Sequence, residues 1–239
     1  MYRHQQTLSR MNKRIEELKQ NFKIFLEHFN NHYLFSGPSL YFHRKVIKIL
    51  SQKGLREAIK DDSFLEYIYA TLASWGLHRM GKTNTKLVDF EEFKNSILEN
   101  KDKILKLENI RITQINTNIE GTNHIMESIN ELINNLKISK AKTKLIFNSK
   151  TLHHLLPNLI PPIDKQYTLS FFYNSKSPSH IENCFSEIYP KFIEIANCCK
   201  DIIIEMTKEG KGFNTSETKV IDNAIIGYVL KNSKKQKKK

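Results

Sequence analysis

Residues 149–168 read SKTLHHLLPNLIPPIDKQYT, and this stretch gives the most specific prediction of local structure in the chain. It predicts a helix that starts with Lys150 and ends before Pro157, because proline disfavours helical geometry in the residue before it. The next two prolines favour an extended link. Asp164 is suited to accept backbone N–H bonds at the start of a second helix. The stretch therefore predicts two short helices joined by a kinked connector.

Helical periodicity extends over most of the 239-residue chain, with apolar residues recurring at three- and four-residue steps. The low content of glycine and proline (8 and 6 residues) argues against a sandwich or barrel. We therefore expect an all-α fold of about ten helices. They are expected near residues 8–29, 39–53, 61–77, 90–100, 103–108, 122–136, 150–156, 165–173, 179–207 and from 216 onward.

No long polar linker divides the chain. We expect one compact helical domain over residues 1–231, with sub-lobes 1–110 and 111–231 as an alternative. Residues 232–239 are rich in lysine and are expected to form a disordered tail.

Positive charge is concentrated at the two ends of the chain, whose formal net charge is +13. Residues 1–60 contain 12 basic and 4 acidic side chains, and the last nine residues contain six lysines. Such segments attract phosphate groups without reading sequence. Nucleic acid is therefore the expected partner, with DNA favoured. A solubilising role for the tail explains its lysines equally well.

The apolar segments, the cysteines and the histidine spacing lead to expectations about membrane contact, cellular location and metal or cofactor binding. No window reaches the ~18 apolar residues of a membrane-spanning helix, so no membrane partner is expected. The three cysteines, Cys184, Cys198 and Cys199, are expected to be reduced thiols in the cytoplasm. No His or Cys spacing matches a metal site, and no cofactor is expected.

Lys150 and Asp164 are the first candidates for chemistry. A partly desolvated lysine loses its proton more readily and can attack a sugar C1′ carbon. A nearby carboxylate can move protons or stabilise a developing positive charge. The alternative is structural: a lysine at the surface or bonded to a carbonyl, and an aspartate that only caps a helix.

Two further segments combine cations with aromatic or glycine residues. The stretch WGLHRMG, residues 75–81, offers His78 as a general acid or base and Arg79 as a phosphate ligand. A plain helix end explains the same stretch. The stretch YFHRK, residues 41–45, interleaves aromatics and cations, as stacking on bases and pairing with phosphate require. From it and the following turn, we expect nucleic-acid contacts from His43, Arg44, Lys45 and Lys48, although a solvated basic helix face is the alternative.

Two resemblances accompany these motifs. Residues 35–43, 69–81, 149–168 and 219–228 resemble segments of an uncharacterised prokaryotic protein family, a likeness that spans most of the chain but implies no activity. A lysine on a helix, a proline-bearing loop and an aspartate at a helix start are also similar to the helix-hairpin-helix DNA glycosylase superfamily. This second likeness covers about thirty residues. It implies a Schiff-base lysine at Lys150 and a catalytic aspartate at Asp164, although residues 144–148 contain no glycine where that superfamily has a glycine-rich hairpin.

The sequence leads to three hypotheses about function. The first is a nucleic-acid-binding helical protein with glycosylase-like or other DNA-processing activity, whose pocket would gather Lys150, Asp164, His78 and Arg79. The second is a non-catalytic interaction or nucleic-acid-binding module. The third is an enzyme acting on a small phosphorylated or nucleotide substrate through Arg79.

Overall fold

The computed structural model describes residues 2–32, 36–78, 80–81, 84–115, 119–141, 143–181 and 183–236. Within these ranges the chain is mainly helical, so the predicted all-α fold is confirmed. The only strands in the described ranges are β1 (Met80–Gly81) and β2 (Asn84–Thr85), which pair antiparallel. None of the helices in the described part of the chain has the length and apolar character needed to span a bilayer.

The chain divides into two compact units that do not follow chain order. Unit 1 combines Met1–Leu34, Ile112–Gln114 and Ile163–Lys239, and unit 2 combines Phe35–Arg111 and Ile115–Pro162. The chain therefore crosses between units at four places. The alternative division expected from the sequence, into sub-lobes 1–110 and 111–231, has a single boundary.

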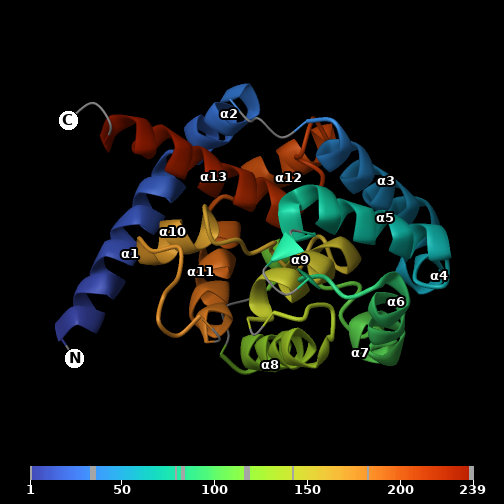
Figure 1. The fold of residues 1–239 in the computed structure, drawn as a ribbon. Coiled ribbons are helices and arrows are strands. Elements are labelled where there is room, and N and C mark those ends of the chain that lie inside the picture. Colours follow the sequence, from blue (N-terminus) through green and yellow to red (C-terminus); the bar gives the residue numbers. More distant parts are fainter. Residues whose placement is uncertain are drawn as a thin grey trace. The chain divides into compact units, whose positions relative to one another are not determined.

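Unit 2 is built around one central helix, α9. Its helices and turns are α3 (Pro38–Lys53), α4 (Leu55–Ala58), α5 (Asp62–Leu72), the π-helical turn η1 (Ala73–Leu77), α6 (Phe90–Glu99), α7 (Lys101–Leu105), α8 (Ile119–Asn135) and α9 (Leu145–Leu155). Every residue of α9 is buried, and α3, α5 and α8 pack against it (Figure 1). The polar side chains of α9 must therefore find partners inside the protein.

Local capping rules hold at several helix ends of unit 2. The Asp61 carboxylate accepts the Ser63 N–H at the start of α5, and Asp89 accepts the Glu92 N–H at the start of α6. Gly54 ends α3 with a φ of 70°, a conformation that glycine adopts without strain. These three boundaries match the sequence-based predictions.

The start of α9 corrects the prediction that Lys150 begins a helix. The helix begins five residues earlier, at Leu145, because three apolar residues at its start are buried in the core. The side-chain amide of Asn148 then donates to the carbonyls of Ile133 and Leu136, at 2.7 and 2.8 Å. It thereby satisfies carbonyls at the end of α8. The predicted end of the helix, before Pro157, is confirmed.

Unit 1 is organised by its last helix, α13. Its elements are α1 (Tyr2–Gln20), α2 (Phe22–His32), the 3-10 turn η2 (Ile112–Gln114), α10 (Thr168–Tyr173), α11 (Cys184–Cys198), α12 (Lys200–Glu209) and α13 (Glu217–Gln236). Helix α13 packs against α2, α10 and α12. It extends into the lysine-rich segment, whose last three residues lie outside the described ranges.

Two helices of unit 1 that the sequence predicts as continuous are interrupted. The first breaks at Asn21, whose side-chain amide donates to the Glu17 carbonyl at 3.1 Å and so competes with the backbone ladder. The second breaks at Cys199, where φ and ψ are −106° and 19°. The Cys199 thiol donates to the Lys19 carbonyl at 3.9 Å, which holds this break against α1. Both breaks involve tertiary or side-chain bonds that apolar periodicity does not encode.

Helices α2 and α13 approach each other at Gly227. A Cβ atom built at this position would lie 1.9 Å from the Phe25 carbonyl oxygen and 2.9 Å from its carbon. Backbone atoms cannot move aside as a flexible side chain can. The absence of a side chain at Gly227 is therefore a condition for this packing.

We expect Gly227→Ala to lower the free energy of unfolding by about 3 kcal/mol or more, because the methyl group forces α2 and α13 apart. Gly121→Ala is the matched control, since Gly121 also lies in a helix but a Cβ there would meet no atom within 4 Å. That control should raise stability by about 0.5 kcal/mol. Urea unfolding followed by circular dichroism measures both. Equal effects of the two substitutions would contradict the close approach.

Candidate functional site

A cluster of aromatic and basic side chains lies inside unit 2. We call it the imidazole cluster, and it consists of His43 on α3, Trp75 on η1 and Lys150, His153 and His154 on α9. The three histidines are fully buried, and Lys150 is 9% exposed. A fully buried histidine is uncommon unless its ring nitrogens have partners.

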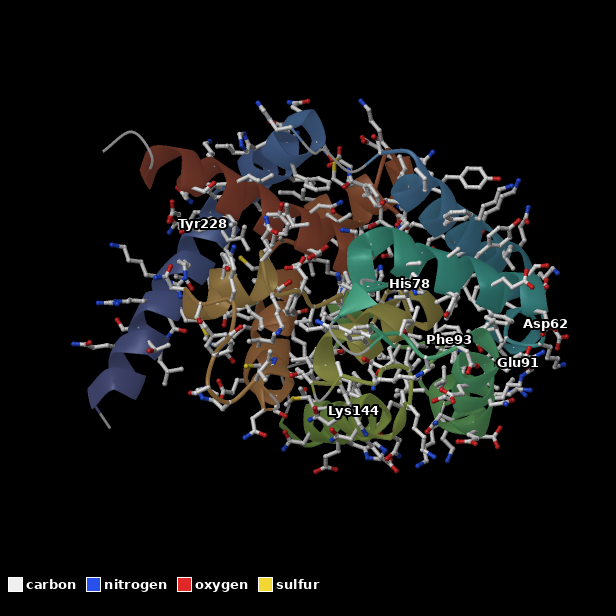
Figure 2. The ribbon with its side chains drawn as sticks, in the orientation of Figure 1. Asp62, His78, Glu91, Phe93, Lys144 and Tyr228 are labelled. Carbon is white, nitrogen blue, oxygen red and sulfur yellow. The ribbon has the colours of Figure 1, made fainter. Side chains whose placement is uncertain are left out.

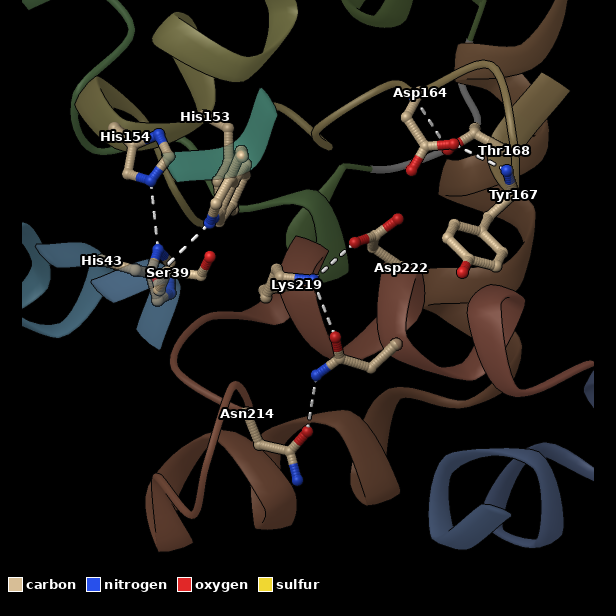
Figure 3. A network of polar contacts seen from close by, with 12 residues as sticks. Ser39, His43, His153, His154, Asp164, Tyr167, Thr168, Asn214, Lys219 and Asp222 are labelled. Carbon is tan, nitrogen blue, oxygen red and sulfur yellow. Dashed lines mark hydrogen bonds and ion pairs between the residues drawn. The ribbon is translucent and has the colours of Figure 1, made fainter. Parts of the chain in front are cut away.

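The bonding pattern of this cluster assigns the ring protons. His154 Nδ1 lies 2.7 Å from the Lys150 carbonyl oxygen, which only accepts, so Nδ1 carries the proton. In the neutral ring Nε2 then accepts, and it lies 3.1 Å from His43 Nδ1, which must donate. His153 Nδ1 likewise donates to the Ile160 carbonyl, at 2.9 Å. Figure 3 draws the bond between His43 and His154.

Trp75 brings these rings and the lysine together. Its ring centroid lies 5.5 Å from that of His43 and 4.9 Å from that of His154. The Lys150 ammonium lies 5.6 Å from the Trp75 ring centroid, within the range of a cation–π contact. The indole N–H donates to the Ser39 carbonyl at 3.3 Å, which fixes the ring against α3. The cluster is therefore a closed, oriented set of side chains.

The backbone around Trp75 is irregular. Gly76 adopts φ and ψ of 80° and 17° inside the π-helical turn, a left-handed conformation that glycine permits. This turn ends the long helical segment that starts at Asp62. Glycine at this position is thus part of what points the indole toward α9.

His43 corrects one sequence-based prediction. It was expected to contact nucleic acid, but it is 0% exposed and bonded to His154. Its neighbour Val46 is buried as well, so this side of α3 faces the core of unit 2. His43 therefore contributes to packing and to the internal bonds of the imidazole cluster.

The other side of α3 carries the remaining predicted contacts. We call it the α3 cationic face, which comprises Tyr41, Arg44, Lys45 and Lys48. Tyr41 is 55% exposed, Arg44 and Lys48 are exposed and Lys45 is half-buried. The spacing of three and four residues places all four side chains on one side of the helix.

Asp164 belongs to unit 1, where it has the capping role that the sequence allowed. Its Oδ1 accepts the Tyr167 backbone N–H at 2.6 Å, and its carbonyl accepts the Leu169 N–H at 3.0 Å. Its own N–H donates to the Thr168 hydroxyl at 3.2 Å (Figure 3). These bonds order the turn before α10. Lys150 belongs to unit 2.

Tyr167 links this turn to a second feature of unit 1. Burial raises the pKa of the Tyr167 phenol, and the carboxylates of Asp164 and Asp222 raise it further. The Tyr167 hydroxyl therefore stays protonated at neutral pH.

Sequence reasoning missed a buried polar network on α13. The Lys219 ammonium donates to Asp222 Oδ2 at 2.6 Å and to Asn223 Oδ1 at 2.7 Å. The Asn223 amide donates to Asn214 Oδ1 at 2.8 Å (Figure 3). Lys219 and Asp222 side chains are only 6% and 4% exposed. The signal in the sequence was three polar residues at positions 219, 222 and 223 of an otherwise apolar segment.

Aromatic rings complete the surroundings of the Lys219 ammonium, and a separate buried carboxylate lies at the start of α13. The Lys219 ammonium lies 5.7 Å from the Phe29 ring centroid and 5.3 Å from that of Phe213. Fully buried Glu217 accepts the Thr113 hydroxyl at 2.9 Å, which ties η2 to the start of α13. Removing one partner of the buried Lys219–Asp222 pair is expected to be strongly destabilising, because it leaves an uncompensated buried charge in unit 1.

His78 and Arg79 are the two remaining residues of the predicted site. His78 follows η1 and is exposed (Figure 2). Arg79 lies outside the described residues, so its predicted phosphate contact stays a prediction. Among the residues that the structure describes, no three His, Cys, Asp or Glu side chains are grouped to hold a metal ion.

The cysteines are free thiols in this structure. Cys184 and Cys199 are buried and Cys198 is exposed. Burial raises the pKa of the Cys199 thiol to about 12, and the neighbouring Cys198 contributes to that shift. Burial also raises the pKa of Cys184. Both buried cysteines are therefore protonated and poorly nucleophilic at neutral pH.

Comparison with known proteins gives no match to a family model, to a curated protein or to a solved structure.

We expect His154→Ala to lower the free energy of unfolding by about 3 kcal/mol, because it leaves a cavity and removes the acceptor of the buried His43 N–H. His124→Ala, on the exposed side of α8, is the matched control and should change stability by less than about 0.5 kcal/mol. Urea unfolding monitored by tryptophan fluorescence measures both. A neutral His154→Ala would refute the bonding pattern assigned to the imidazole cluster.

Proposed function

We propose that the protein binds nucleic acid, with DNA the favoured ligand, through the α3 cationic face. The observation that carries this proposal is one exposed tyrosine and three cations on a single side of a helix that contains no Asp or Glu. Cations at this spacing suit the phosphates of a nucleic-acid backbone. The net charge of +13 supports the same class of partner, since it attracts polyanions at long range.

Two lysines of this face differ from the ion-paired lysines of unit 2. Among the described residues, no carboxylate pairs with Lys45 or Lys48. In contrast, Lys60 pairs with Glu57 and Lys94 with Asp62, each at 2.7 Å. Lys103 pairs with Glu131 in the same way. A lysine without a protein carboxylate can neutralise a phosphate without first breaking an ion pair.

A second candidate function is covalent chemistry by the Lys150 amine, as the likeness to DNA glycosylases implies. The observation that favours it is the placement of a largely buried ammonium over Trp75, whose ring also contacts the three imidazoles. In that reaction the deprotonated amine adds to the C1′ aldehyde of an abasic sugar and water leaves. The iminium that forms is reduced by added borohydride to a stable amine.

For the α3 cationic face, we expect Arg44→Ala/Lys45→Ala/Lys48→Ala to weaken DNA binding by at least tenfold at physiological salt. The dependence of log K on log salt should become shallower by about two to three units, because three phosphate contacts are lost. Fluorescence anisotropy with labelled oligonucleotides measures both quantities.

The matched control is Lys60→Ala/Lys94→Ala/Lys103→Ala, which removes the same charge from ion-paired positions. It should retain most of the affinity. Equal losses in the two triple variants would mean that net charge alone governs binding, and the proposal for α3 would then be wrong.

For Lys150, we expect borohydride to trap a covalent adduct with DNA that contains an abasic site. The adduct should disappear in Lys150→Ala and persist in Lys144→Ala, which removes an exposed lysine that precedes the same helix. Intact-mass spectrometry measures the adduct, and circular dichroism establishes that each variant is folded. Absence of an adduct from the wild-type protein, or its persistence in folded Lys150→Ala, would exclude this chemistry for Lys150.

A further inference from the structure

We infer that the α3 cationic face selects single-stranded DNA over duplex DNA, because it presents an aromatic ring where an unpaired base can stack. This inference rests on the proposed nucleic-acid binding and narrows its ligand. Its central residue is Tyr41, the most exposed of the large apolar side chains in the described residues, at 55%. An exposed aromatic ring among cations is the usual platform for a nucleobase.

The Tyr41 ring is supported from within the same helix. The Lys45 ammonium lies 5.4 Å from its ring centroid, so one face of the ring carries a cation. The ring of Phe42 meets that of Tyr41 edge-on, with centroids 5.4 Å apart and an interplanar angle of 75°. Phe42 in turn lies 6.2 Å from the Tyr67 ring of α5. The ring is thus oriented by contacts that continue into unit 2.

The length of the face suits a short stretch of strand. Lys48 lies seven positions after Tyr41, which corresponds to about 10 Å along the helix axis. Roughly three stacked nucleotides cover this length at about 3.4 Å each. One base on Tyr41 therefore leaves the flanking phosphates within reach of Arg44 and Lys48.

Duplex DNA can use only part of this face. Its bases are paired and stacked on one another, so a tyrosine on a helix surface reaches no base plane without opening the helix. The cations still contact the phosphates of a duplex. Tyr41 should therefore contribute to single-strand affinity alone, while Lys48 contributes to both.

The test measures anisotropy of a labelled 12-nucleotide single strand and of the matching 12-base-pair duplex at one salt concentration. We expect wild-type protein to bind the single strand more tightly. Tyr41→Ala should weaken single-strand binding by about tenfold and leave duplex binding within about twofold, since stacking on an aromatic side chain is lost. Tyr41→Phe should retain the preference. Leu98→Ala, an exposed apolar residue elsewhere in unit 2, is the control and should change neither affinity.

The outcomes separate this inference from the proposal on which it rests. If Tyr41→Ala leaves both affinities unchanged or lowers both equally, the single-strand inference is overturned, while the effect of the triple α3 variant still decides the binding proposal. If the wild-type protein binds neither DNA, both fail. An RNA strand of the same sequence is the last arm. Tighter binding to RNA than to DNA would overturn the assignment of DNA as the ligand.

Discussion

Burial of the whole of α9 is the constraint on which unit 2 depends. This helix carries five uncharged polar side chains and one lysine, and every one of its residues is buried. Each polar group left without a partner in such a place costs about 1–3 kcal/mol. The bonds of Asn148 to the end of α8, of His153 to Ile160 and of His154 to His43 are the response to that cost. They fix how α8, the proline connector and α3 surround α9.

Unit 1 follows the same rule with a different chemistry. Helix α13 places Lys219 and Asp222 in the core, where desolvation of two charges opposes folding. The pair is accommodated because Asn223 and two aromatic rings complete the surroundings of the ammonium. Elsewhere on the same helix, the lack of a side chain at Gly227 allows the backbones of α2 and α13 to lie in contact. Polar satisfaction and close approach together leave α13 few alternative positions in its unit.

Helix boundaries that depend on neighbouring residues could be predicted from the sequence. The helix starts predicted near residues 61 and 90 and the stop before Pro157 depend on neighbouring residues, and the structure has all three. The start of α9, the break at Cys199 and the burial of His43 depend on partners distant in sequence, so periodicity could not give them. The α13 network was hidden for the same reason, since polar residues in an apolar segment can face solvent or each other. Of the predicted site, Arg44, Lys45 and Lys48 lie together, and Asp164 makes the capping bond that its position at a helix start predicts.

Helix α3 shows why an interleaved motif must be resolved residue by residue. Consecutive residues of a helix point about 100° apart, so YFHRK is not one surface. Tyr41 and Arg44 face solvent, while His43 between them enters the imidazole cluster. One helix therefore joins an internal bonded cluster to an external cationic surface. On the proposed function, a substitution at His43 lowers stability and one at Arg44 lowers affinity for nucleic acid, so stability and binding measured together assign each residue to its role.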